Sequence, residues 1–98
     1  MSNNAFILQD YLLAKQLQGL SHTTLWAYEY AVGRMFREID KDYQSITTSD
    51  LREYLMSLKV SDVSRSIYIK NLHVFWRWLV REGHRQDDPM ERKEGFST

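Results

Sequence analysis

The 98-residue sequence contains no cysteine, a single proline and only four glycines. Without cysteine, disulfide frameworks, thiolate zinc sites and cysteine nucleophiles are excluded. The scarcity of glycine and proline favours packed helices over a loop-rich or disordered chain. No apolar run approaches the length that spans a bilayer, and the first nine residues lack the basic and then hydrophobic build of a signal peptide. We therefore expect a cytoplasmic protein.

The chain also lacks an excess of charge of either sign. Thirteen Lys and Arg residues balance thirteen Asp and Glu residues, so the formal net charge is zero. An electrostatic argument about binding must therefore rest on where the charges lie rather than on their sum. The length is that of one domain with a single hydrophobic core.

Apolar residues recur at helical spacing in four segments, and no segment alternates apolar and polar residues as a strand does. The pattern predicts four helices: 4–18, 21–40, 47–59 and 64–83. Ser21 is placed as the N-cap of the second helix, and Thr47 with Asp50 resembles a capping box at the start of the third. Either Ser61 or Ser64 fits as the N-cap of the fourth. We expect a compact all-α domain, orthogonal or bundle-like, in which four helices bury their apolar stripes against one another.

The fourth helix combines an apolar face with a basic one. Four polar residues follow one another on its second face at spacings of four, three and four: Ser66, Lys70, His73 and Arg77. Arg65 and Arg81 extend the charge, and no acidic residue lies between them. Such a face is either an ordinary solvated surface or a surface that binds phosphates, and helix periodicity alone leaves both interpretations open.

The aromatic residues and the start of the second helix also allow two interpretations. Most aromatic side chains at helical spacing in so small a domain belong to the core, although Trp26 and Trp78 fit the core stripes least well. Ser21 and Thr24 cap the second helix, and the same helix start is a potential site for a phosphate.

The order of these motifs resembles one protein family. The motifs are Gly19-Leu20-Ser21, Thr24, Tyr28, Phe36, Ile46-Thr47, Asp50-Leu51, Tyr54-Leu55, the stretch from Phe75 to Gly83, and Asp88-Pro89. From about Phe6 to Pro89 the chain resembles the N-terminal core-binding domain of tyrosine recombinases, the phage-integrase and Xer-like enzymes. The family usually ends this domain with Asn-Pro, where this chain has Asp88-Pro89.

The resemblance implies a fold, partners and a set of DNA contacts. It implies a SAM-like four-helix domain over 6–89, preceded by a flexible lead over 1–5 and followed by a linker over 90–98 toward a catalytic domain. In the family the second and fourth helices lie on double-stranded DNA at the recombination site. The implied contacts are Thr23, Tyr30, Arg34, Arg37, Arg65, Ser66, Lys70, His73 and Arg77. The catalytic groups lie downstream, so this fragment is expected to be non-catalytic and without a cofactor, with its own C-terminal catalytic domain and other recombinase protomers as further partners.

An alternative is a helical protein-interaction module that binds a partner through Trp26, Trp78 and the surface of the third helix. No metal site is expected, because the three histidines are far apart in sequence and have no cysteine or i, i+4 histidine partner. Asp87 and Asp88, beside Pro89, are interpreted as a turn rather than as a catalytic pair.

Overall fold

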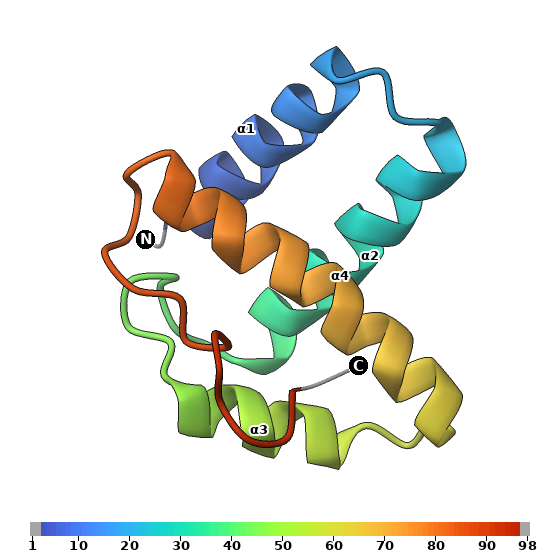
Figure 1. The fold of residues 1–98 in the computed structure, drawn as a ribbon, viewed down its shortest axis with the longest axis vertical. Coiled ribbons are helices and arrows are strands. Elements are labelled where there is room, and N and C mark those ends of the chain that lie inside the picture. Colours follow the sequence, from blue (N-terminus) through green and yellow to red (C-terminus); the bar gives the residue numbers. More distant parts are fainter. Residues whose placement is uncertain (1–2, 97–98) are drawn as a thin grey trace.

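A computed structural model describes residues 3–96, and within this range the chain forms four α-helices and no strand (Figure 1). The helices are α1 (Asn4–Leu17), α2 (His22–Glu38), α3 (Thr48–Ser57) and α4 (Asp62–Arg81). The all-α prediction with four helices is confirmed. None of the helices in the described range is long and apolar enough to cross a membrane.

Local side-chain caps fix where the helices begin. The Ser21 hydroxyl accepts a hydrogen bond from the Thr24 amide at the start of α2, as expected from the sequence. At α3, Thr47 and Asp50 form a complete capping box. For α4, the hydroxyl of Ser61 caps the helix, so α4 starts two residues earlier than the predicted boundary.

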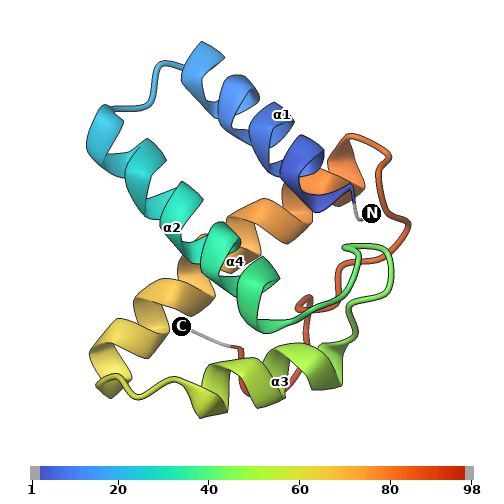
Figure 2. The same ribbon diagram turned by 180° about the vertical axis from the view of Figure 1, so that it is seen from behind.

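α1 and α2 lie side by side, and α4 crosses α2 on one side. α3 lies at the end of the molecule opposite the connection between α1 and α2 (Figures 1 and 2). The long connection between α2 and α3 passes beside the start of α1. There the side chain of Asn4 donates to the Lys41 carbonyl and accepts from the Tyr43 amide, both at 2.8 Å. Asn4 is therefore part of the fold, whereas residues 1–2 of the expected lead lie outside the described range.

An aromatic cluster occupies the centre, where α1 meets α4. The ring centroid of Tyr11 lies 5.0 Å from that of Phe75 and 5.2 Å from that of Trp78, both in edge-on contact. Trp78 is only 4% exposed, so it belongs to the core although its position fits the core stripe of α4 poorly. It packs against α1, which sequence spacing within α4 does not reveal. Trp26, by contrast, is 64% exposed.

The segment after α4 packs against the helices instead of extending away from them. Met90 and Phe96 are buried, and the guanidinium of Arg52 lies over the Phe96 ring. The Thr48 hydroxyl donates to the Pro89 carbonyl at 2.6 Å. The linker expected from residue 90 onward is thus, through residue 96, a docked segment, because its two apolar side chains find a site beside α3 and α4.

Candidate nucleic-acid interface

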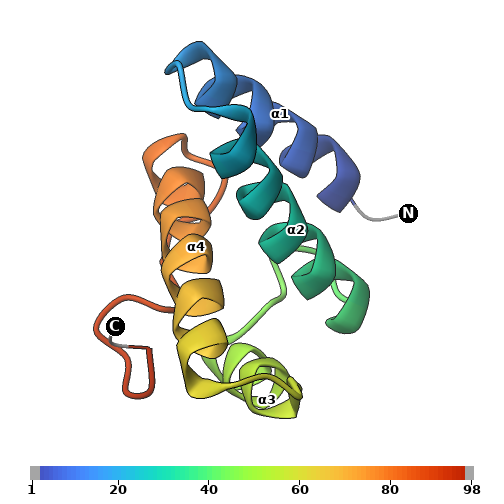
Figure 3. The same cartoon turned by 90° about the vertical axis from the view of Figure 1, so that its right-hand side faces the viewer.

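α2 and α4 lie next to each other on one face of the molecule (Figure 3). Between their N-terminal halves is an open groove of about 360 Å³. Its lining is mostly apolar and consists of Trp26, Ala27, Tyr30, Ala31, Val60, Ser64, Ile67, Tyr68 and Asn71. The groove therefore brings together residues from the two helices that the sequence analysis connected with DNA.

Aromatic rings form a continuous path across this groove. Trp26 stacks on Tyr30 with ring centroids 5.3 Å apart, and Tyr30 lies 6.2 Å from Tyr68 on the other helix. Tyr30 is 41% exposed, and Ile67 beside Tyr68 is 55% exposed. Large apolar side chains thus remain in contact with water along both walls of the groove.

Arg34 connects the two helices next to this aromatic path. Its Nη1 donates to the Tyr68 hydroxyl at 3.2 Å, and its guanidinium lies over the Tyr68 ring at 5.8 Å. The hydrogen bond with Tyr68 raises the pKa of Arg34 above its ordinary value. Because a guanidinium has five N–H donors, most of them stay available after this one bond. Arg34 is thus a cation whose side chain is positioned by Tyr68 and whose remaining N–H groups can still donate hydrogen bonds.

Several of the expected contact residues on the two helices are exposed and make no side-chain hydrogen bond to any residue in the described range: Thr23, Arg37, Ser66 and Lys70. Arg77 is also exposed, and its Nε donates to the His73 carbonyl one turn earlier in α4. These side chains are free to meet an external anion without first breaking a contact with another helix.

His73 and Arg65 face other parts of the chain. The Nε2 atom of His73 lies 2.7 Å from the Phe96 carbonyl, which only accepts, so this nitrogen carries the proton in the contact. The guanidinium of Arg65 donates to the Leu55 carbonyl at 2.9 Å and to the Leu58 carbonyl at 3.0 Å. His73 therefore binds the C-terminal segment and Arg65 binds the end of α3, although both are among the predicted DNA contacts.

Sequence reasoning did not single out Ile67 and Asn71, which line the groove from α4. They are four residues apart and so lie one above the other on a helix. That spacing was visible in the sequence, but which face of α4 meets α2 was not.

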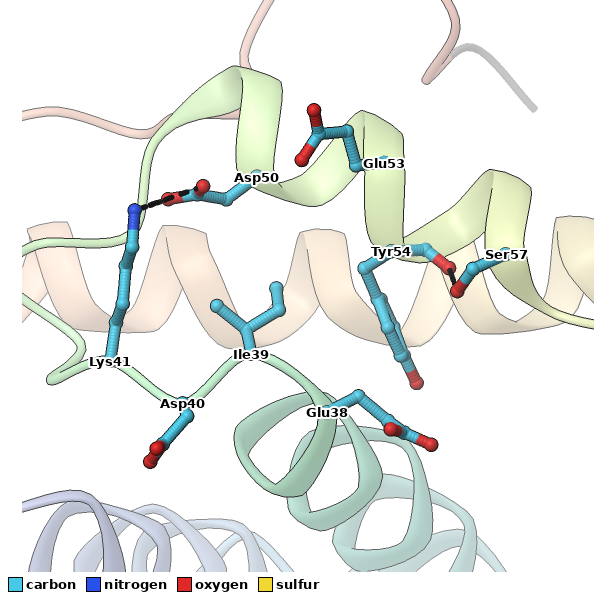
Figure 4. A pocket seen from close by; sticks show the side chains of 8 residues that line it. All are labelled: Glu38, Ile39, Asp40, Lys41, Asp50, Glu53, Tyr54 and Ser57. Carbon is cyan, nitrogen blue, oxygen red and sulfur yellow. Dashed lines mark hydrogen bonds and ion pairs between the residues drawn. The ribbon is translucent and has the colours of Figure 1, made fainter.

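Carboxylates gather at another part of the surface, between the end of α2 and α3 (Figure 4). The acidic residues of this pocket are Glu38, Asp40, Asp50 and Glu53. Lys41 pairs with Asp50 at 3.0 Å. Hydrogen bonds from the Thr47 backbone and then from Lys41 lower the pKa of Asp50 below its ordinary value. This pocket is unfavourable for phosphates, in contrast to the face of α2 and α4.

The described residues contain no cluster of three histidine, aspartate or glutamate side chains arranged to hold a metal ion. The surface proposed for a protein partner is divided, because Trp26 is exposed and Trp78 is buried in the core.

These features define a small all-α domain with an aromatic groove between its second and fourth helices and exposed cations on both. The family model "Phage integrase, N-terminal SAM-like domain" matches residues 7–85, and the chain belongs to this family. The resemblance to the N-terminal domain of integrases, and with it the SAM-like fold, is confirmed. No curated protein and no solved structure matches the chain.

Proposed function

We propose that this chain is the DNA-binding, non-catalytic domain of a tyrosine recombinase, and that it holds the core of a recombination site with the face formed by α2 and α4. Strand exchange would belong to a C-terminal catalytic domain of the same enzyme, acting with other recombinase protomers on the DNA. The family supports an integrase role, and the DNA contact is our assignment.

The observation that carries the proposal is the separation of charge on the surface. Arg34 contacts Tyr68 between α2 and α4, and Lys70 and Arg77 are exposed on α4, whereas the carboxylates of the acidic pocket lie between the end of α2 and α3. Although the net charge is zero, these cations give α4 and the adjoining part of α2 a surface suited to a phosphate backbone. Arg34 supports the assignment further, because its bond to Tyr68 limits the side-chain freedom that binding would otherwise have to remove.

The experiment is a salt titration of binding. The 98-residue chain is mixed with a fluorescent duplex of about 20 base pairs, and the dissociation constant is measured by anisotropy at several salt concentrations. Four phosphate contacts, from Arg34, Arg37, Lys70 and Arg77, predict a slope of log K against log salt of about −3.6. Lys70→Ala is expected to weaken binding and to make the slope shallower by about 0.9.

The matched control is Lys93→Ala, which removes another exposed lysine, from the C-terminal segment. It should leave both affinity and slope close to those of the native chain. If the two variants lose the same affinity, attraction is spread over the whole surface and the assigned face is wrong. If the native chain does not bind DNA at low salt, the DNA-binding proposal itself fails.

A further inference from the structure

Arg34 lies on α2 about one turn before Glu38, the last residue of that helix. Side chains four residues apart on a helix are neighbours, so an arginine and a glutamate at this spacing can form an ion pair. Neither an ion pair nor a hydrogen bond joins these two side chains, although both lie in the described range; Arg34 donates to the Tyr68 hydroxyl instead. We infer that the Tyr68 hydroxyl is a positioning group that keeps Arg34 away from Glu38 and so leaves its charge available to a DNA phosphate. This inference rests on the proposed function and adds the residue on which the Arg34 contact depends.

The partner of Arg34 decides what this side chain offers to a phosphate. A carboxylate partner would compensate the positive charge, and its two oxygens can occupy two N–H groups of a guanidinium at once. The Tyr68 hydroxyl is a neutral acceptor, so it occupies one N–H group and leaves the charge uncompensated. Arg34 bound to Tyr68 therefore attracts a phosphate more strongly than Arg34 bound to Glu38 would.

The side chains of Arg34 and Glu38 lie against different helices. The guanidinium of Arg34 lies over the Tyr68 ring of α4, 5.8 Å from its centre. Glu38 lines the acidic pocket between the end of α2 and α3 (Figure 4). It is exposed, and its carboxylate makes no ion pair or side-chain hydrogen bond within residues 3–96. Glu38 is thus an anion close to Arg34 along α2 that Arg34 does not use.

Tyr68 can position Arg34 because the tyrosine ring is itself packed between the two helices. Tyr68 is half-buried, and its ring centroid lies 6.2 Å from that of Tyr30 on α2. The hydroxyl contributes the hydrogen bond to Arg34, and the ring contributes the contact with the guanidinium face. Tyr68→Phe removes only the hydroxyl, so this variant separates the hydrogen bond from the ring contact.

The first test measures DNA affinity for the native chain, Tyr68→Phe, Glu38→Gln and the double variant. Each binds a duplex of about 20 base pairs at several salt concentrations. We expect Tyr68→Phe to weaken binding about threefold or more and to make the salt slope shallower by up to about 0.9, because Arg34 then pairs with Glu38. In the Glu38→Gln background, Tyr68→Phe should have little effect, since the competing carboxylate is gone. Glu38→Gln removes a negative charge, so each effect of Tyr68→Phe is compared within its own background.

The second test follows Arg34 without DNA, through the NMR signal of its Nε–Hε group. In the native chain Glu38→Gln should leave this signal nearly unchanged, because Tyr68 is the partner of Arg34. In Tyr68→Phe the same substitution should shift the signal, because Glu38 has become the partner. The control Tyr28→Phe removes a hydroxyl from α2 whose ring stacks on Tyr11 of α1, and it should change neither the affinity nor the Arg34 signal.

The outcomes separate this inference from the proposed function. If Tyr68→Phe binds DNA as tightly as the native chain, the hydroxyl does not position Arg34 for binding, and the inference is overturned while DNA binding stands. If Tyr68→Phe weakens binding equally with Glu38 and with Gln at that position, the hydroxyl acts independently of Glu38, and the inference is again wrong. If the native chain does not bind DNA, the proposed function fails, whereas the Arg34 signal still decides whether Tyr68 keeps Arg34 from Glu38.

Discussion

Arg65 lies in the first turns of α4, and its side chain reaches back to the end of α3. The last carbonyl groups of a helix have no partner inside that helix. Arg65 donates to the carbonyls of Leu55 and Leu58 and pairs with Asp62 at 2.9 Å. The guanidinium thus closes the turn between α3 and α4 and completes the hydrogen bonding of both segments.

Arg65→Ala is expected to lower the free energy of unfolding by about 2–3 kcal/mol, because half-buried carbonyl groups lose charged donors and the ion pair is lost as well. Urea denaturation followed by circular dichroism measures the change. The control is Lys70→Ala on the exposed side of α4, which should stay within about 0.5 kcal/mol of the native chain. Equal stability of the two variants would mean that the contacts of Arg65 do not stabilise the turn.

At the scale of the helices, features that depend on neighbours in sequence were predictable. The caps at Ser21 and Thr47 are set by residues three positions apart, and the structure has both. The start of α4 was ambiguous because Ser61 and Ser64 are both good cap residues, and the structure selects Ser61. The burial of Trp78 was not evident because it depends on α1, which is distant in sequence.

The same distinction applies to the candidate interface. Helix periodicity gave the outward residues of α2 and α4, including Lys70, because that face follows from the spacing within one helix. It did not predict the partner of Arg65 or of His73, since each contacts residues outside its own helix: the end of α3 for Arg65 and the C-terminal segment for His73. It also missed Asn71, because a groove exists only once two helices are placed side by side.

The capping box of α3 predicts a dependence of stability on pH. Asp50 accepts from the Thr47 amide and from Lys41, which lowers its folded-state pKa below the ordinary value of 3.8. The carboxylate therefore contributes stability above pH 3.8, and this contribution is lost as the pH falls through the lower folded-state pKa. Asp50→Asn should be less stable than the native chain at neutral pH, and the difference should shrink toward acid pH.

Urea denaturation at a series of pH values tests this expectation. Glu53→Gln is the matched control, because Glu53 is an exposed carboxylate on the same helix that makes no side-chain hydrogen bond within residues 3–96. A difference between Asp50→Asn and the native chain that stays constant down to the lowest pH would contradict the role assigned to the carboxylate.

At the scale of the whole molecule, one group of carboxylates and one group of cations lie apart. The formal net charge is zero, yet the acidic pocket lies between α2 and α3, and Lys70 and Arg77 lie on the outer side of α4. Such an arrangement orients a molecule in the field of a polyanion even when the net attraction is small. Under the proposed function, this orientation would turn the cationic side of α4 toward the DNA.

The extent of the folded unit is the last point at this scale. The family match ends at residue 85, but Met90 and Phe96 are buried against α3 and α4. The Arg52 Nε donates to the Glu94 carbonyl at 3.2 Å, and His73 contacts the carbonyl of Phe96. Residues 86–96 therefore complete the hydrophobic core that the earlier residues begin.

Phe96→Ala should lower the free energy of unfolding by about 3 kcal/mol, because a fully buried ring is replaced by a cavity and the contact with Arg52 is lost. A chain ending at residue 85 should be less stable still, since it also loses Met90. Urea denaturation measures both, with Met56→Ala as a control on the exposed side of α3 that is expected within about 0.5 kcal/mol of the native chain. Native stability in the shortened chain would show instead that residues 86–96 rest on a domain already complete without them.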